Sequence, residues 1–447
     1  MGAASPTNFY VGRNSFGQST TEAIFSKNFN NFLKTKSFNL ALGSQLRIDR
    51  FRLYEGDSSS YKVGPLATSN AKAPGASGRP GISPSDVTNE SRTNIGFFAD
   101  VETDITDNFL VATALRYENY SDFGSNLSGK LASRYKIGKN FAIRGSINKG
   151  FRAPSLQQIF NSQTTSTVQS GAIRQTQQLR SNDPRLSQIG INYPKPETSW
   201  NYNLGVTAKA GSKFLFTLDA YQIDITDRII ISEQLAVGAA IPSLIPLFPG
   251  IREITFFTNQ INTTTKGIDL VTTFKQKLSK NSNLTASLAL TFNKTEITNS
   301  KATPAQLTAG AANPAAIKII DTISISLIET SQPRNKILFS LGYQIKKFNA
   351  SVKATYFGDV TAWEKPTGLP HRSQTFKGKT LFDLTATYAF SKRFSFTAGA
   401  NNITNVYPDK VLSNYSSYSS GQIPYTRNAS QFGFNGAYYY GSLSINF

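Results

Sequence analysis

Side chains of alternating polarity recur along about fifteen segments of this 447-residue chain. Residues 284–292 read Leu-Thr-Ala-Ser-Leu-Ala-Leu-Thr-Phe, and residues 381–390 read Leu-Phe-Asp-Leu-Thr-Ala-Thr-Tyr-Ala-Phe. Successive side chains of a β-strand point to opposite faces of a sheet, so this period of two predicts strands with one apolar and one polar face. No apolar run approaches the roughly 18 residues of a transmembrane helix, which excludes a helical membrane protein.

The connections between the predicted strands alternate between short and long. Tight turns at 106–108, 138–140 and 391–393 contrast with long polar stretches at 55–91 and 152–198. Transmembrane β-barrels have this order, with short periplasmic turns and long extracellular loops, whereas soluble β-sandwiches mix loop lengths. The pattern predicts an all-β fold, an antiparallel transmembrane β-barrel whose carboxyl end lies on the short-turn side.

Both signs of charge occur on the polar face of the predicted strands. Such mixed charges suit a water-filled interior, because a dry core would leave them without hydrogen-bond partners. The charged positions are Arg47, Asp49, Asp100, Glu102, Arg116, Glu118, Lys130, Arg134, Arg144, Lys353 and Asp383. We count about fifteen strands, or sixteen with the first residues; roughly sixteen can close as a porin, whereas transporters with a plugged lumen use about 22.

The last segment carries the alternation to the final residue. Tyr439, Leu443, Ile445 and Phe447 fall on one face, and the chain stops on this last aromatic residue. The termini of soluble domains usually fray, whereas the last strand of a barrel must pair so that no edge is left in lipid. The segment resembles the signal that directs bacterial outer-membrane barrels to the barrel assembly machinery for membrane insertion.

Basic residues outnumber acidic ones by 47 to 27, which gives a formal net charge of +20. They are spread along the chain without a dense patch, so nucleic-acid binding is disfavoured. Three interpretations stay open: lysines in short turns, arginines that meet lipopolysaccharide phosphates in the outer-membrane lipid, and an anionic cargo. Cysteine is absent, which excludes disulfides and thiolate chemistry and fits an exported bacterial protein.

Five short motifs resemble those of TonB-dependent outer-membrane receptors, in the family's order. The first is Gly150, Phe151, Arg152, Ala153 and Pro154, at the outer end of a predicted strand. The others are Lys-Pro-Glu-Thr-Ser at 195–199, a strand at 219–230 that contains Asp-Arg-Ile, Lys-Gly-Ile-Asp-Leu at 266–270, and Asn-Asn-Ile-Thr-Asn-Val-Tyr at 401–407. Ile403 and Thr404 depart from the last motif. The resemblance covers roughly residues 90–447.

The resemblance implies that residues 1–447 form a single partial barrel domain, with about 15–16 strands of an expected 22-stranded barrel. The family's amino-terminal plug domain, the segment that engages the TonB energy-coupling complex, and the first strands have no counterpart here. The first residues, Met-Gly-Ala-Ala-Ser-Pro-Thr, also lack a secretion signal. We expect the chain to be the downstream piece of a longer outer-membrane precursor from a Gram-negative bacterium.

Catalysis finds little support in the sequence. His371 is the one histidine, and no nucleophile motif surrounds it. No phosphate-binding glycine loop, zinc spacing or calcium loop occurs, so no metal site, cofactor or catalytic residue is predicted. A Pro cannot donate a hydrogen bond to a strand ladder, so Pro154 suits the point where a strand leaves the sheet. We favour a pairing role in the lumen for Arg152 over a role in touching cargo.

Cargo binding is expected in the long loops, where arginine and aromatic side chains occur together. Arginines with aromatic faces suit anionic or aromatic ligands such as an iron chelate. At each position, an ordinary solvated loop residue is the competing interpretation. The candidates are Arg174, Arg180, Arg185, Trp363, His371, Arg372, Tyr425 and Arg427.

The leading hypothesis is the barrel part of an active-transport receptor for a scarce nutrient. Ferric siderophores or similar chelates are the commonest cargo of the family that the motifs resemble, and TonB-coupled energy would drive import. A passive, porin-like channel of about sixteen strands is the alternative. A barrel enzyme such as an outer-membrane hydrolase is the third hypothesis, and it would depend on His371.

Overall fold

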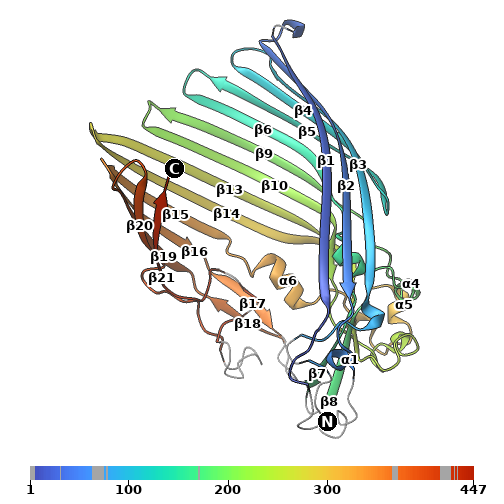
Figure 1. Ribbon diagram of the computed structural model, residues 1–447. Coiled ribbons are helices and arrows are strands. Elements are labelled where there is room, and N and C mark those ends of the chain that lie inside the picture. Colours follow the sequence, from blue (N-terminus) through green and yellow to red (C-terminus); the bar gives the residue numbers. More distant parts are fainter. Residues whose placement is uncertain are drawn as a thin grey trace.

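The computed structural model describes residues 6–30, 32–62, 75–76, 79–169, 172–364, 371–412, 424–426, 428–429 and 431–446 (Figure 1). Its main feature is one strongly curved sheet of fifteen strands, in which each strand pairs antiparallel with its sequence neighbours in the sheet. The strands are β1 (Arg13–Asn30), β2 (Ser37–Tyr54), β3 (Thr88–Asp104), β4 (Phe109–Tyr120), β5 (Gly124–Ile137), β6 (Phe141–Arg152), β9 (Glu197–Ala210), β10 (Phe214–Ile231), β13 (Phe257–Ser279), β14 (Ser282–Ser300), β15 (Asn335–Ile345), β16 (Phe348–Phe357), β19 (Lys379–Ala389), β20 (Phe394–Asn401) and β21 (Tyr438–Ile445).

The predicted all-β antiparallel fold is confirmed. The alternating segment at 284–292 lies inside β14, and residues 381–389 of the second segment lie in β19. Several strands are much longer; β13, for example, has 23 residues. About 9–11 residues cross a bilayer, so these strands project beyond it on the long-loop side.

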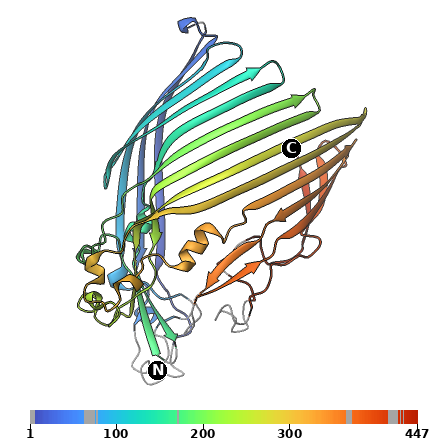
Figure 2. The same ribbon diagram turned by 180° about the vertical axis from the view of Figure 1, so that it is seen from behind.

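The sheet is a single curved layer (Figures 1 and 2). Its two faces differ in polarity, as the alternation predicts. Large apolar side chains are exposed on the convex face, for example Leu204 at 62%, Leu131 at 53% and Phe292 at 47%. The concave face carries the polar and charged side chains. No second sheet packs against this layer in the described part of the chain, so the apolar convex face is free to meet lipid.

The carboxyl-terminal strand β21 follows the predicted pattern. Tyr439 and Leu443 are 67% and 62% exposed on its apolar face, and Ile445 pairs with Phe394 next to the short turn at 391–393. The strand therefore ends on the short-turn side, as predicted, while Phe447 lies outside the described residues. Within the described residues, β21 pairs only with β20 and β1 pairs only with β2, so the sheet has two open edges.

The long connections were predicted to be loops, and that prediction is wrong for much of their length. They contain short helices and strands, gathered at one end of the sheet (Figure 1). These are α1 (Ser58–Tyr61), η3 (Pro84–Asp86), α3 (Leu156–Phe160), β7 (Gln163–Gln169), β8 (Ala172–Gln178), α4 (Pro184–Gln188), β11 (Leu235–Ala236), η4 (Pro242–Leu244), β12 (Glu253–Thr255), α5 (Ala305–Thr308), η5 (Pro314–Ala316), α6 (Thr322–Glu329), β17 (Val360–Glu364) and β18 (Arg372–Phe376). The turn η2 (Phe32–Lys34) lies at the opposite end.

Two caps formed by these connections hold much of the buried apolar surface. The first cap comprises β7, β8, α4, β11, η4, β12 and α5, and its core includes Leu186, Leu244, Phe248 and Ile254 at no more than 1% exposure. The second cap comprises the β17–β18 hairpin and the described residues of 405–434, and it packs around Val360 and Phe376. A third, smaller core lies against the sheet itself, where Phe51 and Leu53 of β2 pack with Ile82 and Leu156.

Candidate functional site

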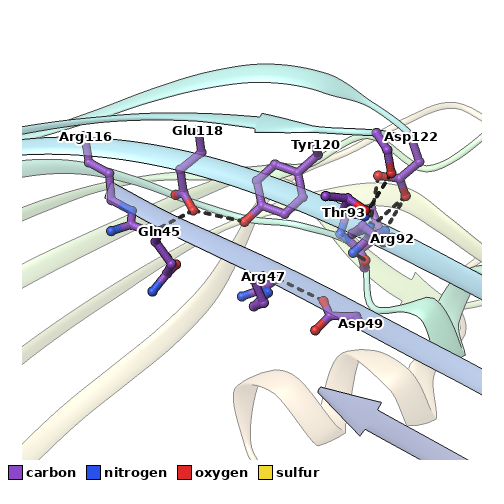
Figure 3. A network of polar contacts seen from close by, with 11 residues as sticks. Gln45, Arg47, Asp49, Arg92, Thr93, Arg116, Glu118, Tyr120 and Asp122 are labelled. Atoms are coloured by element: carbon purple, nitrogen blue, oxygen red, sulfur yellow. Dashed lines mark hydrogen bonds and ion pairs between the residues drawn. The ribbon is translucent and has the colours of Figure 1, made fainter. Parts of the chain in front are cut away.

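A network of charged side chains lies on the concave face where β2, β3 and β4 approach the caps (Figure 3). The strand register places these side chains side by side, because Arg47 pairs with Asn94 and Asn94 pairs with Tyr120. Arg47 lies 3.1 Å from Asp49, and Arg116 lies 3.2 Å from Glu118. The sequence predicted all four of these charged side chains on a polar wall.

Arg92 is the most buried cation of this wall, with 3% of its side chain exposed. Its guanidinium donates to both carboxylate oxygens of Asp122 at 2.5–3.0 Å and to the carbonyl of Pro154 at 2.7 Å. It also lies over the ring of Phe123, at 5.2 Å from the ring centre. The Gly150–Pro154 motif is thus tied to β3 through its last carbonyl. The sequence analysis did not select Arg92 or Asp122.

Each arginine of this network has a carboxylate partner, so the wall is close to electrically neutral. Some buried polar atoms of the network nevertheless have no hydrogen-bond partner among the described residues. The side-chain amide of Asn94 is fully buried, and neither its oxygen nor its nitrogen has a partner among the described residues. The same holds for Arg47 Nε and Asp49 Oδ1. Each unpaired buried polar atom costs about 1–3 kcal/mol, so this part of the wall carries a local energetic cost.

Three of the family-like motifs meet at Glu197. Arg152 donates two hydrogen bonds to its carboxylate, at 2.8 and 2.5 Å, and the backbone N–H of Ile229 donates to the same group at 2.7 Å. Glu197 is 7% exposed on its side chain, whereas Arg152 is 52% exposed. The pairing that we favoured for Arg152 is therefore present in the structure.

Asn259 on β13 forms further hydrogen bonds at the same junction. Its side chain accepts a hydrogen bond from the Lys195 amide at 2.7 Å, and donates to the Lys195 and Asp227 carbonyls at 2.9 and 2.6 Å. These contacts join residues that are far apart in the sequence. The motifs therefore join the ends of different strands through hydrogen bonds.

Tyr193 lies beside this junction, in the connection that follows α4. Partial burial of the ring raises the pKa of its hydroxyl to about 12, and the negative charge of Asp122 adds to the effect. The phenol is neutral at physiological pH, as an ordinary tyrosine is, and offers a hydrogen-bond donor. Nothing in its sequence surroundings distinguished Tyr193 from an ordinary loop residue.

Other ion pairs continue along the concave face toward the short turns. Arg144 donates to Asp219 at 3.1 and 2.5 Å, and Lys353 lies 2.7 Å from Asp383. The Arg144 side chain is 45% exposed, and that of Lys353 is 48% exposed. Partly exposed pairs of this kind contribute little to stability and are compatible with a watered surface.

The arginine candidates at 174–185 lie in or next to the first cap. Arg180 donates to the carbonyls of Ser85 and Val87, both at 2.8 Å. Arg185 pairs with Asp183 at 2.7 Å and lies 4.5 Å from the centre of the Phe248 ring. Both cations therefore hold the cap together. Arg174 lies on β8, and its side chain is outside the described residues.

The remaining candidates lie in the second cap. Trp363 and Arg372 occupy neighbouring rungs of the β17–β18 hairpin, which begins its return strand just after His371. His371 Nε2 is buried and has no hydrogen-bond partner in the described part of the chain. Arg427 is outside the described residues. The structure thus divides the candidates between two caps and does not gather them into one site.

Tyr425 belongs to a ladder of stacked rings in the second cap. Its ring centre lies 6.4 Å from that of Tyr407 and 5.6 Å from that of Phe434. A cavity of about 230 Å³ borders this ladder and is also lined by Asp409. Tyr407 ends the fifth motif in the sequence, but neither it nor Phe434 was selected. Stacked aromatic faces of this kind suit a flat or aromatic ligand.

Neither a metal centre nor a membrane-spanning helix is found in the described part of the chain. Among these residues, no three His, Cys, Asp or Glu side chains gather closely enough to hold a metal ion. No described helix is long and apolar enough to cross a bilayer.

Comparisons with known proteins agree on one family. A family model described as TonB dependent receptor-like, beta-barrel, matches residues 2–403. A probable TonB-dependent siderophore receptor, PirA of Acinetobacter baumannii, is 30% identical over 117 residues, which are 26% of this chain and 15% of that protein.

Solved structures share the fold at lower identity. A mutant ferric enterobactin receptor, PfeA of Pseudomonas aeruginosa, in complex with enterobactin has a TM-score of 0.63 and 15% identity, over 97% of this chain and 55% of that one. The siderophore receptor PirA from Acinetobacter baumannii has a TM-score of 0.61 and 16% identity, over 97% and 55%. The chain thus spans about half the length of these receptors.

Proposed function

This chain belongs to the TonB-dependent receptor β-barrel family. We propose that it forms part of the barrel of an outer-membrane receptor that imports a ferric siderophore or a similar chelate. Members of the family are transport receptors of the outer membrane of Gram-negative bacteria, and they are not enzymes. The observation that carries the proposal is the fold itself, with an apolar convex face and a charge-paired concave face.

The concave wall is suited to line a route for solute. Several of its charges form ion pairs along the strands, and these pairs offer hydrogen-bonding groups to a charged chelate. Asn94, Arg47 and Asp49 carry polar atoms without a hydrogen-bond partner among the described residues. We propose that the concave face surrounds the plug domain of the complete receptor, on which TonB-coupled energy would act.

Cargo capture is assigned to the second cap. The ladder of Tyr407, Tyr425 and Phe434 offers aromatic faces, and a cavity of about 230 Å³ lies beside it. The arginines of the first cap are occupied by Asp183 and by backbone carbonyls, so they are weaker candidates. Catecholate and other aromatic chelates are the class that stacked rings favour.

A passive channel is the less favoured function. A closed pore in lipid needs every strand edge paired, and β1 and β21 do not pair with each other among the described residues. We propose that further strands join these edges in the complete protein.

Uptake by the complete receptor tests the proposal. Cells that lack the gene would be supplied with radiolabelled iron on catecholate, hydroxamate or citrate carriers, and complemented with the wild-type gene or with Tyr425→Ala. We expect complementation to restore uptake of one carrier class only when TonB is present, and Tyr425→Ala to reduce that uptake about tenfold. Uptake that is independent of TonB, or a steady single-channel conductance from the receptor in planar bilayers, would contradict the proposal.

A further inference from the structure

A cluster of cations lies on the concave face at the short-turn end of β5, β6 and β9. The cations belong to these strands and to the tight turn at 138–140, and they border one cavity. They are Arg134, Lys136, Lys139, Arg144 and Lys209. No carboxylate lines this cavity among the residues that the structure describes. The cavity therefore has an excess of positive charge on its walls.

The strand register explains why this charge is unbalanced. Arg134 and Arg144 lie directly opposite each other across β5 and β6, an arrangement in which like charges destabilise a sheet. Arg144 pairs with Asp219 on β10, and the pair reaches across Gly205 of β9, which places no side chain between them. Arg134 Nε is buried and has no hydrogen-bond partner among the described residues. An anion beside Arg134 would supply the acceptor that the strands do not.

The lysines of the cluster also keep their charge available. Arg144 is the member of the cluster that forms an ion pair in the described part of the chain. Lys136 donates to the carbonyl of Asp107 at 3.4 Å, which is long for a hydrogen bond. Lys209 is held beside the turn by its backbone, because its N–H donates to the Asn140 carbonyl at 2.8 Å. Its ammonium group is exposed beside the cavity.

Short side chains between the cations leave a cavity of about 270 Å³. Ala142 and Thr207 follow Lys136 in one cross-strand row, and Gly205 follows Arg144 in the next. The long cationic side chains border the space that these short residues leave open. Pockets for drug-sized ligands measure about 300–1,000 Å³, so this cavity suits a smaller molecule.

The spacing of the cations selects the class of anion. Adjacent strands lie about 4.8 Å apart, so charges on β5, β6 and β9 are spread over roughly 10 Å. A single phosphate cannot contact cations on both outer strands, whereas a molecule with several carboxylates can. The concave face is the water-facing one, which disfavours an acyl chain. A small soluble polycarboxylate meets all of these conditions.

We propose that this cavity binds a small soluble polycarboxylate, with one carboxylate at Arg134 and a second at Lys209. The planar guanidinium of Arg134 matches a carboxylate, and the Thr207 hydroxyl between the two cations adds a hydrogen-bond donor. The role of the site rests on the proposed function: it would hold an anionic solute at the short-turn, periplasmic end of the concave wall before release. The aromatic ladder of the second cap lies at the opposite end of the sheet.

Isothermal titration calorimetry of the complete receptor in detergent tests this site, with the tricarboxylate citrate as the probe. We expect a dissociation constant below about 1 mM. Arg134→Gln/Lys209→Gln should weaken citrate binding at least about tenfold, because each change removes a charged hydrogen-bond donor. Inorganic phosphate should bind at least about tenfold more weakly than citrate, since it cannot engage both outer strands. Trimethyl citrate has no charge and should not bind.

Matched variants separate this site from general electrostatic attraction. Lys275→Gln/Lys277→Gln removes the same charge from the short-turn end of β13, outside the cavity, and should leave the dissociation constant unchanged. Thr207→Glu keeps every cation but places a carboxylate inside the cavity. It should abolish citrate binding and raise the melting temperature, which keeps the test decisive if the double variant does not fold.

Three results would overturn the proposal. They are equal weakening by the two charge-removing double variants, equal affinity for phosphate and citrate, and unchanged citrate binding in Thr207→Glu. The test is independent of transport, because calorimetry requires neither TonB nor an iron chelate. Citrate binding by a receptor that fails the uptake test would retain the site and refute the proposed function, and uptake without citrate binding would do the reverse.

Discussion

Glu197 joins two residues of other strands, Arg152 on β6 and Ile229 on β10. Replacing it with Ala removes the partner of Arg152 and leaves the buried N–H of Ile229 without an acceptor. We expect the free energy of unfolding in lipid vesicles to fall by about 2 kcal/mol for Glu197→Ala. Glu197→Gln keeps an acceptor for Ile229 and should cost about 1 kcal/mol, because Arg152 is half exposed and can be solvated.

Glu22→Gln is the control for this prediction. Glu22 is exposed on β1, and its described hydrogen bond is to Gln45, at 2.7 Å. The change should alter the free energy of unfolding by less than about 0.5 kcal/mol in the same urea titration. If Glu197→Ala had no larger effect than this control, the hydrogen bonds of Glu197 would not stabilise the junction between the strand ends.

Asp183 makes the first cap sensitive to acid. Burial of its carboxyl opposes ionisation, but hydrogen bonds from the side chain and amide of Arg185, with its positive charge, outweigh burial and lower the pKa of Asp183. A carboxyl with a lowered pKa in the folded state contributes stability above its ordinary value of about 4, and this stability is lost as the pH falls through the folded pKa.

Hydrogen exchange checks this acid sensitivity. Amides of α4 should lose protection, relative to their intrinsic exchange rates, as the pH falls below about 4. In Asp183→Asn the protection should be lower at neutral pH and should not fall further in acid, because the titrating group is gone. Parallel pH profiles in the two proteins would show that Asp183 is not the group responsible.

At the scale of the elements, aromatic rings on the concave face cover glycines on the neighbouring strands. Tyr221 covers Gly267, and a Cβ atom built on Gly267 would lie 2.3 Å from its ring. Phe98 covers Gly43 and Tyr440 covers Gly399 in the same way, each from the directly opposite position. A ring packed on a glycine fixes the register of two strands.

Gly267→Ala should therefore displace the Tyr221 ring and lower the free energy of unfolding by about 1–2 kcal/mol. Gly342 on β15 is the matched control, since the nearest atom to its added Cβ would be the Thr285 carbonyl oxygen at 3.9 Å. Gly342→Ala should be neutral or slightly stabilising in the same assay. Equal effects of the two changes would mean that packing of the Tyr221 ring does not require a glycine at position 267.

The strands were predictable from the sequence because the polarity of successive side chains within each strand reflects the surroundings of its two faces. In β14, for example, every second residue meets lipid and the rest meet water, so the alternation alone locates the strand. The caps were not predictable in this way. Ile241, Leu244 and Phe248 belong to a core assembled from several connections, and their proline-rich segment has no period that indicates burial.

The candidate site shows the same division. The pairing role of Arg152 was predicted from a short motif, whereas Arg92, Tyr193 and Phe434 became visible only through contacts between distant segments. Selecting loop arginines by composition was less informative, because Arg180 and Arg185 turned inward to hold the first cap. Composition identifies residues that can bind a ligand, but contacts show which of them are already occupied.

At the scale of the whole molecule, the account depends on one curved sheet with a wet concave face and a lipid-facing convex face (Figure 2). Its two open edges need partners before it can rest in a bilayer. The caps extend the wall beyond the membrane on the long-loop side, which is where cargo would first meet the protein. The proposed function uses this geometry, with solute on the concave side and lipid on the convex side.

Nitroxide scanning along β14 tests the two-faced sheet most directly. The chain has no cysteine, so single cysteines can be placed at each position from 285 to 291 and spin-labelled without a background signal. Labels at 286, 288 and 290 should collide preferentially with oxygen dissolved in the bilayer, and labels at 285, 287 and 291 with a water-soluble nickel complex. Uniform accessibility, or a reversed period, would contradict the account.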